Sequence, residues 1–292
     1  MKKITIISLL ALLFTVNAGA QEEEARNKII TAAVNNVQYT KKEVKQTAGK
    51  VIGEVLTAVV AGESTQQIDN YEDAVRAAIV KGLSGARRIK CIDGQLTPEE
   101  AAQPNTWYVD ANIANVSTTT KIETYEDKDK KKHTRTYYRG IIGTTLLLKD
   151  SRTDEVFNSP SFNISAEDAS WMESPEGALN NALMRLANSI TNYMNRSLPL
   201  KANILEGARE KKDKQKEVYI DLGSAEGGFS GLHFDVFTIK TIAGREARKK
   251  IGRLKISTVE GDDISLCKVQ SGGRDIKAAI DAGEQLLIIT TD

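Results

Sequence analysis

The sequence predicts an α+β protein, in which a mixed α/β domain with a mostly antiparallel sheet and two to three helices precedes a small all-β barrel-like domain. Three observations predict this: a strand–helix–strand order near the start, an amphipathic helix that ends before Pro199, and short alternating segments separated by glycines after residue 200. The 292 residues are 40% hydrophobic and 27% charged, as in ordinary globular proteins. We therefore expect domains at 21–200 and 201–292, preceded by a signal peptide at 1–20.

The N-terminal segment has the composition of an export signal. Lys2 and Lys3 precede an apolar run from Ile4 to Val16, and the small residues Ala18-Gly19-Ala20 follow. We expect cleavage between Ala20 and Gln21. No cysteine adjoins this site, so no lipid anchor is expected. The mature protein is predicted to reside in the periplasm or at the outer-membrane periphery, where peripheral association with the membrane is open to it.

The mixed domain is expected to begin with strands and helices joined by short connections. In order, these are a strand at 28–39, a helix at 43–60, a more regular helix at 66–84 and a strand at 88–92. Apolar residues at three- and four-residue spacing predict the helices, although Gly49 and Gly53 weaken the first. Asp69 or Asn70 is suited to cap the second helix.

A meander and a helix complete this domain. The expected strands are 107–116, 118–124, 135–148 and 155–164, with a charged tip at 125–132. Ser174-Pro175-Glu176 then combines a capping residue, a proline suited to the first helical turn and an acid that complements the helix dipole. A helix is therefore expected from Ser174, ending before Pro199.

The second domain is expected to consist of short strands and glycine turns. Residues 207–217 are dense in charge and indicate a hairpin tip or a linker. The strands expected after it are 218–222, 232–239, 251–259, 264–269 and 285–290. The glycines interpreted as structural turn residues are Gly223, Gly228, Gly231, Gly252 and Gly283. The loop from Gly223 to Gly231 leads into a strand and not a helix, so we interpret it as a turn and not as a phosphate-binding loop.

Composition argues against several functional classes. The net charge is +1, without the basic excess or the aromatic content typical of nucleic-acid binding, so no nucleic-acid partner is expected. The two histidines and two cysteines form no metal-binding or nucleophile motif, and we predict no catalytic residue, no metal and no cofactor. Cys91 and Cys267 lie in apolar strand-like runs, where buried free thiols are the preferred interpretation over a disulfide bond.

One charged segment is a candidate for contact with a partner. Between Lys128 and Arg139, basic residues alternate with tyrosines. This pattern suits contact with an acidic partner or a glycan, and it also suits a solvated hairpin tip whose charge is balanced by nearby acids. The candidate contact residues are Lys130, Lys131, Lys132, Arg135, Tyr137, Tyr138 and Arg139.

The second domain carries several short motifs in a fixed order. They are Asp221-Leu222-Gly223, the run Gly228…Gly231-Leu232-His233-Phe234-Asp235-Val236, then Ile251-Gly252-x-Leu254-x-Ile256, Ile264–Val269 and Ile280-Asp281-Ala282-Gly283. In this order they resemble the C-terminal barrel domain of flagellar assembly protein T over residues 218–290. One departure is His233, which stands close to a position where an aspartate is usual in that family.

The first domain also has a characteristic order of motifs. The helix end Ile79–Ser84 precedes the strand Arg88–Asp93, Tyr108-Val109-Asp110 lies in the next strand, and Leu146–Val156 precedes the late amphipathic helix. Over residues 28–200 this layout is similar to that of the curli-transport channel component, the amino-terminal domain of the translocation protein TolB, and the lipoprotein activators of penicillin-binding proteins.

These resemblances imply an exported, non-enzymatic cell-envelope protein that acts as an assembly or adaptor module through protein–protein contacts. The implied partners are other envelope proteins or further copies of this chain. Two alternatives stay open: an oligomeric outer-membrane secretion channel of the curli-transport type, and an envelope enzyme or glycan-binding protein. Against the channel, Val116–Tyr125 and His133–Arg139 carry threonine and charge where lipid-facing strands require apolar residues at alternate positions.

Overall fold

The computed structural model describes residues 27–40, 65–67 and 71–291. The predicted signal peptide with its Ala20–Gln21 cleavage site and the helix predicted at 43–60 lie outside these residues. The described chain consists of a mixed β-sheet covered by helices, followed by a closed antiparallel β-barrel, and this confirms the predicted fold class. Contacts between Cα atoms divide it into two compact units, 30–194 and 195–291, and the second also includes 27–29.

The first unit is built on a sheet that is seven-stranded within the described residues. Its elements are β1 (Ile30–Tyr39), β2 (Thr65–Gln67), α3 (Glu72–Ser84), β3 (Ile89–Asp93), α4 (Pro98–Ala101), β4 (Thr106–Glu126), β5 (Lys132–Asp150), β6 (Val156–Asn158), β7 (Ser161–Ile164) and α5 (Pro175–Ser197). The strand order is β3-β1-β4-β5-β6, with β2 beside β4 and β7 beside β5. β1 is parallel to β3 and β4, and the other pairs are antiparallel.

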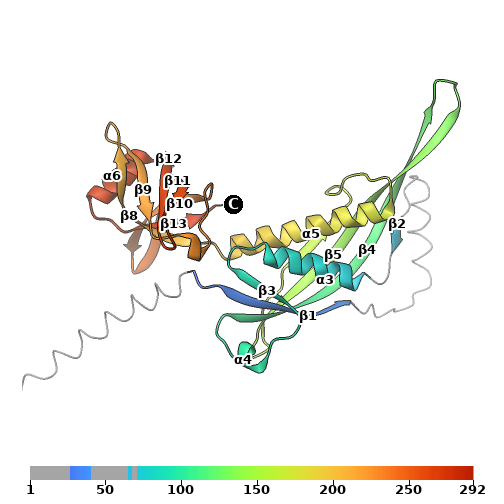
Figure 1. Ribbon diagram of the computed structural model, residues 1–292, viewed down its shortest axis with the longest axis horizontal. Coiled ribbons are helices and arrows are strands. Elements are labelled where there is room, and N and C mark those ends of the chain that lie inside the picture. The colour runs from blue at the N-terminus through green and yellow to red at the C-terminus, as the bar shows by residue number, and fades with distance from the viewer. Residues whose placement is uncertain (1–26, 41–64, 68–70, 292) are drawn as a thin grey trace, which may run out of the picture. The chain divides into compact units, whose positions relative to one another are not determined.

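Helices α3 and α5 lie side by side over one face of this sheet (Figure 1). Their apolar stripes supply much of the core, and these buried residues are Val75, Ile79, Leu83, Leu179, Leu186 and Ile190, over Val109, Ile113, Leu146 and Leu148 of β4 and β5. The two helices approach closely at Gly82, where a Cβ would lie 2.7 Å from the carbonyl oxygen of Ala187. The Thr191 hydroxyl donates a hydrogen bond to the Gly82 carbonyl at 2.7 Å in the same place.

Three elements of this unit differ from the sequence prediction. The helix expected at 66–84 begins only at Glu72, since Thr65–Gln67 pair as a strand with Ser117–Thr119, and Tyr71 takes the N-cap position instead of Asp69 or Asn70. The strand expected at 155–164 is divided into β6 and β7, because Pro160 between them has no N–H to donate. The short helix α4 was not predicted, although Thr97 and Glu100 form a capping box at its start.

The second unit is a closed barrel in the order β10-β11-β12-β9-β8-β13. Its elements are β8 (Lys201–Glu210), β9 (Gln215–Ile220), the 3₁₀ turn η1 (Ser224–Glu226), β10 (His233–Ile242), β11 (Arg245–Val259), β12 (Ser265–Ser271), α6 (Gly273–Asp281) and β13 (Leu286–Thr290). The last strand closes the barrel, since β13 pairs with both β8 and β10. Side chains from all six strands fill the interior, among them Ala202, Val218, Phe234, Leu254, Cys267 and Ile288.

The charge-dense segment 207–217 forms the ends of β8 and β9 and the turn between them, so the hairpin-tip interpretation holds and the linker interpretation is wrong. Helix α6 was not predicted, because Gly272 and Gly273 at its start resemble a turn. It nevertheless buries Ile276 and Ala279 against the barrel.

Candidate protein-contact hairpin

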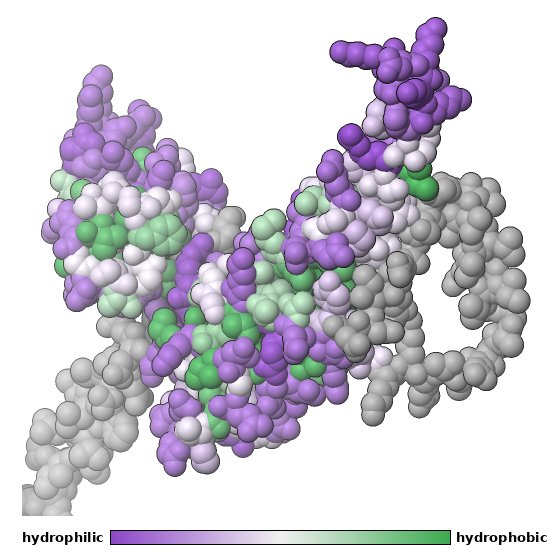
Figure 2. Space-filling model, turned by 45° about the vertical axis from the view of Figure 1, so that its right-hand side comes forward, coloured by the Kyte–Doolittle hydropathy of each residue, from purple (hydrophilic) through white to green (hydrophobic). Residues whose placement is uncertain are grey.

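The candidate site is the part of the β4–β5 hairpin that projects beyond the helices. Gly140 is covered by α5, where a Cβ on it would meet the Ala178 carbonyl and the Ala182 side chain. From Lys121 to Arg135 the side chains are almost all exposed. Figure 1 shows this ribbon extending past the ends of α3 and α5, and Figure 2 shows a strongly hydrophilic end. We call residues 120–138 the contact hairpin.

The strand register divides the contact hairpin into two different faces. Directly opposed residues of an antiparallel pair share a face, and here the pairs alternate between charged or aromatic residues and threonines. The cationic–aromatic face contains Lys121, Glu123, Tyr125, His133, Arg135, Tyr137 and, next along β5, Arg139. The threonine face contains Thr120, Ile122, Thr124, Thr134, Thr136 and Tyr138. Ile122 is 61% exposed there.

Stacked rings and cations order the cationic–aromatic face. The ring centroids of Tyr125 and His133 are 5.5 Å apart with an interplanar angle of 27°. The Arg135 Cζ lies 5.4 Å from the Tyr125 ring centroid, and the Arg135 Nη1 donates a hydrogen bond to the Tyr137 hydroxyl at 3.4 Å. The two contacts of Tyr125 join β4 to β5, and the Arg135–Tyr137 hydrogen bond lies within β5; together they order a ribbon that has no core beneath it.

Trp171 joins this face from the segment that precedes α5. The Arg139 Cζ lies 4.2 Å from the Trp171 ring centroid, and the Lys121 Nζ lies 6.0 Å from it. Met172 pairs with Tyr138 through two backbone hydrogen bonds, which places Trp171 opposite Arg139. Sequence reasoning missed Trp171, because the contact depends on a pairing between segments more than thirty residues apart.

At the tip, Asp127 organises the turn. Its Oδ2 lies 2.6 Å from His133 Nε2, and its Oδ1 accepts hydrogen bonds from the backbone N–H groups of Asp129 and Lys131, each at 2.9 Å. The contact with His133 is the main cause that lowers the pKa of Asp127, and the two backbone donors add to it.

The predicted contact residues therefore fall into three places. Arg135, Tyr137 and Arg139 lie together on the cationic–aromatic face, and Tyr138 lies on the threonine face. Lys130, Lys131 and Lys132 lie at the tip, where Lys131 accepts a hydrogen bond from Asp127 through its backbone carbonyl. Residues 121–139 carry seven basic and four acidic side chains, a net charge of +3 with His133 neutral.

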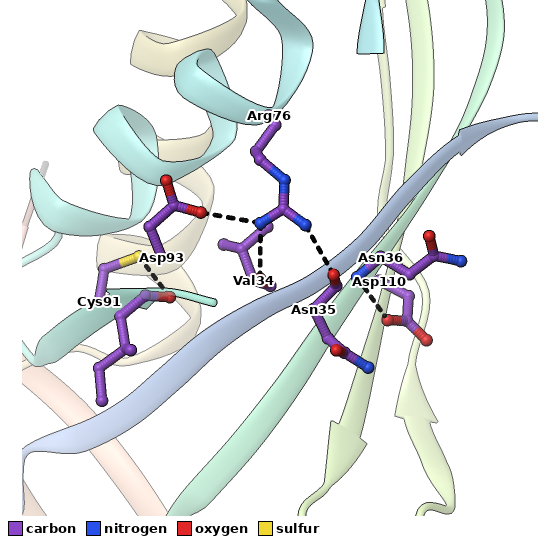
Figure 3. Close-up of polar contacts among 8 residues, drawn as sticks. Val34, Asn35, Asn36, Arg76, Cys91, Asp93 and Asp110 are labelled. Carbon is purple, nitrogen blue, oxygen red and sulfur yellow. Dashed lines mark hydrogen bonds and ion pairs between the residues drawn. The ribbon is translucent and has the colours of Figure 1, made fainter. Parts of the chain in front are cut away.

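A second polar cluster lies at the carboxyl end of β3 (Figure 3). Arg76 donates hydrogen bonds to the carbonyls of Val34 and Asn35 at 2.8 and 2.6 Å, and it forms an ion pair with Asp93 at 2.8 Å. Next to it, Asp110 accepts from the Asn36 N–H. The carboxyl ends of parallel strands often bind ligands, but here Arg76 occupies that place and satisfies the backbone where the register of β1 shifts. We assign this cluster a structural role.

The predicted turn glycines lie at the barrel. The loop from Gly223 to Gly231 includes η1 and packs on the β11–β12 turn, where Ser224 donates to Asp262 at 2.9 Å, and a Cβ on Gly223 would clash with the backbone of Asp262. Gly231 has a φ of 103°, in the region that favours glycine. Two placements differ from a strand turn: Gly252 lies inside β11 beside a bulge, and Gly283 follows the end of α6.

Both cysteines are free thiols with raised pKa values. Burial is the main cause in each case, and it raises the pKa of Cys267 to about 12. Among the residues that the structure describes, no group of histidine, cysteine and acidic side chains is arranged to hold a metal ion. Within the same residues, no helix is both long and apolar enough to cross a membrane.

Comparisons with known proteins add little. No family model matches the sequence, and no curated protein matches it. Among solved structures, a neuraminyllactose-binding hemagglutinin homolog from Helicobacter pylori is similar at 9% sequence identity, over 59% of this chain and 86% of that chain, with a TM-score of 0.29. The similarity is distant, and we base no argument on it.

Proposed function

We propose that this protein is an exported, non-enzymatic cell-envelope protein that acts as an assembly or adaptor module, and that it contacts its partners through the contact hairpin. The observation that carries the proposal is the cationic–aromatic face, an ordered array of exposed and half-buried arginine, tyrosine and tryptophan side chains outside the core of its unit. Tyrosine, tryptophan and arginine are the residues most enriched at the energetic centres of protein interfaces.

The contact hairpin adds little to the stability of its own unit. A two-stranded ribbon is marginally stable in water, and this one exposes Tyr125 (46%) and Ile122 instead of burying them. A ribbon that is already ordered in the free protein pays less conformational entropy when it binds. A role in binding therefore gives a reason for its length and for the contacts that order it.

The envelope location and the assembly role draw on the sequence. The segment ending at Ala20 has the pattern of an export signal, and the two domains resemble components of curli transport and of flagellar assembly. These resemblances imply envelope proteins that recruit or scaffold assemblies, or in the curli case form oligomeric secretion pores. We extend the recruiting or scaffolding role to this chain as part of the proposal.

The nucleophile candidates also favour a non-enzymatic role. A thiol attacks as the thiolate, and burial of Cys91 and Cys267 favours the neutral form of both at neutral pH. His133 contacts Asp127 at the exposed tip of the hairpin, and this contact orders the turn.

The proposal is tested by capture from the native envelope with the chain from Gln21 onward as bait. The test variant replaces residues 122–136 with Asn-Gly, a two-residue turn that joins the opposed residues Lys121 and Tyr137. The control variant keeps the hairpin and carries Lys211→Gln and Lys212→Gln, in the exposed turn between β8 and β9.

We expect the unaltered chain and the control to retain one defined partner and the shortened variant to lose it, with unchanged thermal unfolding of all three. Equal capture by all three would contradict the proposed role of the hairpin. A ring-sized oligomer that makes liposomes leak in a size-selective way would replace the adaptor with the export channel.

A further inference from the structure

The outer edge of β5 is the edge that faces away from β4, and it is paired along only part of its length. Along this edge β5 pairs with β7 through Ile142–Thr145, and then with Met172 at Tyr138, where the two residues exchange hydrogen bonds of 2.8 and 2.9 Å. The chain then leaves the edge and begins α5 at Pro175. Within the described part of the chain, no strand pairs with this edge between Lys132 and Tyr137.

The backbone of this free edge is arranged to receive another strand. The N–H and C=O groups of Tyr138 point outward to Met172, and in an antiparallel strand every second residue has the same orientation. The backbone groups of Thr136 and Thr134 therefore also point outward. Unpaired groups of this kind at a sheet edge are a template for strand addition.

Two arginines lie beside this edge, and neither forms an ion pair within the described residues, although the charge of Glu173 acts on Arg135 from a greater distance. Arg135, Tyr137 and Arg139 lie at alternate positions of β5, roughly 6.8 Å apart. Among the described residues no carboxylate lies within ion-pair distance of Arg135 or Arg139, and the Arg139 Nε is buried without a hydrogen-bond partner. By contrast, Lys121 on the same face is paired with Glu123.

We propose that the β5 edge binds an acidic, extended segment of a partner protein, which adds as a strand beside Lys132–Tyr137 and places carboxylates at alternate positions opposite Arg135 and Tyr137. This inference rests on the proposed function and specifies the partner. A carboxylate opposite Tyr137 is a diagonal neighbour of both arginines, within reach of their long side chains. Backbone hydrogen bonds supply affinity, and the alternation of acids supplies specificity.

The first experiment measures peptide binding to the chain from Gln21 onward by fluorescence anisotropy. One probe is an eight-residue peptide that alternates glutamate and valine, so that all its acids share one face. The matched probe has the same composition but arranges its residues as Glu-Glu-Val-Val twice over, so that no two glutamates stand two positions apart on the same face. We expect the alternating peptide to bind roughly tenfold more tightly, because only it presents both carboxylates to the arginines.

Two pairs of variants distinguish the contribution of the arginine charges from that of the backbone hydrogen bonds along the β5 edge. Arg135→Gln with Arg139→Gln is expected to weaken binding roughly tenfold, through the loss of two ion pairs with the peptide, whereas Lys211→Gln with Lys212→Gln, in the exposed turn between β8 and β9, changes it less than about twofold. Thr136→Pro removes an outward N–H without breaking a β4–β5 hydrogen bond and is expected to abolish binding. Thr124→Pro makes the same change on the outer edge of β4, since Thr124 faces Thr134 in the ladder, and it is expected to bind as the unaltered chain does.

Equal binding of the two peptides, or equal effects of the two proline variants, would overturn the inference. So would binding of anionic vesicles or of an acidic glycan that survives Thr136→Pro while neither peptide binds. If the peptides fail but capture from the envelope still depends on the hairpin, this inference fails and the proposed function stands. If capture is also independent of the hairpin, both fail.

Discussion

At the scale of single residues, the close contact of α3 with α5 depends on Gly82. A Cβ there would lie 2.7 Å from the Ala187 carbonyl oxygen and 2.8 Å from the Ile190 Cβ, so Gly82→Ala must push the helices apart. We expect a loss of about 1–3 kcal/mol in the free energy of unfolding, measured by chemical denaturation. Gly261→Ala is the matched control, since the nearest atom to its Cβ is 3.8 Å away. Equal losses from both would show that the helix contact is looser than described.

The two thiols give a second test at this scale. Cys267 is fully buried, and burial raises the pKa values of both cysteines. We expect Cys267 to react with a thiol reagent only after unfolding, and Cys91 to react slowly in the folded protein at pH 8. Denatured protein without reductant should give two thiols per chain. A count of zero would mean that the cysteines are joined, contrary to the structure.

The pair of Asp150 and Arg152 gives a pH-dependent prediction. Hydrogen bonds from the Arg152 side chain are the main cause that lowers the pKa of Asp150 from 3.8 to about 2. Because the folded-state pKa is depressed, the ionised pair stabilises the fold above pH 4, and this contribution is lost as pH falls from about 4 to about 2. Carboxyl titration by NMR should show that Arg152→Gln returns the pKa toward 3.8. An unchanged value in the variant would assign the shift to another cause.

At the scale of elements, β10 carries the largest side chain in the barrel core. Phe234 is 0% exposed, whereas Phe229, in the loop before β10, is 50% exposed. Phe234→Ala is expected to cost about 3–5 kcal/mol in the free energy of unfolding. Phe229→Ala makes the same chemical change in the same unit and should cost less than about 1 kcal/mol. Comparable losses would contradict the assignment of the core.

Elements with a strong local signal could be predicted from the sequence. Helix α5 begins where Ser174-Pro175 predicts, and the charged and threonine faces of the hairpin follow from alternation along each strand. The features that the sequence did not predict depend on contacts between residues that are distant in sequence. β2 is a strand because it pairs with β4, and α6 is a helix because the barrel buries Ile276 despite the glycines before it. Trp171 became part of the site only through the pairing of Met172 with Tyr138.

At the scale of the whole molecule, the division of contacts near residue 195 predicts two units that respond separately to substitution. Gly82 and Phe234 lie in different units. We therefore expect the losses from Gly82→Ala and Phe234→Ala to add within about 0.5 kcal/mol, or to shift two separate unfolding transitions. Hydrogen exchange of each single variant should show faster exchange in its own unit only. A double variant whose loss departs strongly from the sum would contradict separate units.

The central claim is that the contact hairpin meets a different protein in the envelope. Its most direct measurement is photo-cross-linking in the native cell, with a photoreactive residue in place of Tyr137 and, as a control in the barrel unit, in place of the exposed Phe229. The account predicts one discrete adduct with another envelope protein from position 137, lost when Thr136 is also changed to proline, and no such adduct from position 229. An adduct made only of copies of this chain, or no adduct from position 137, would contradict it.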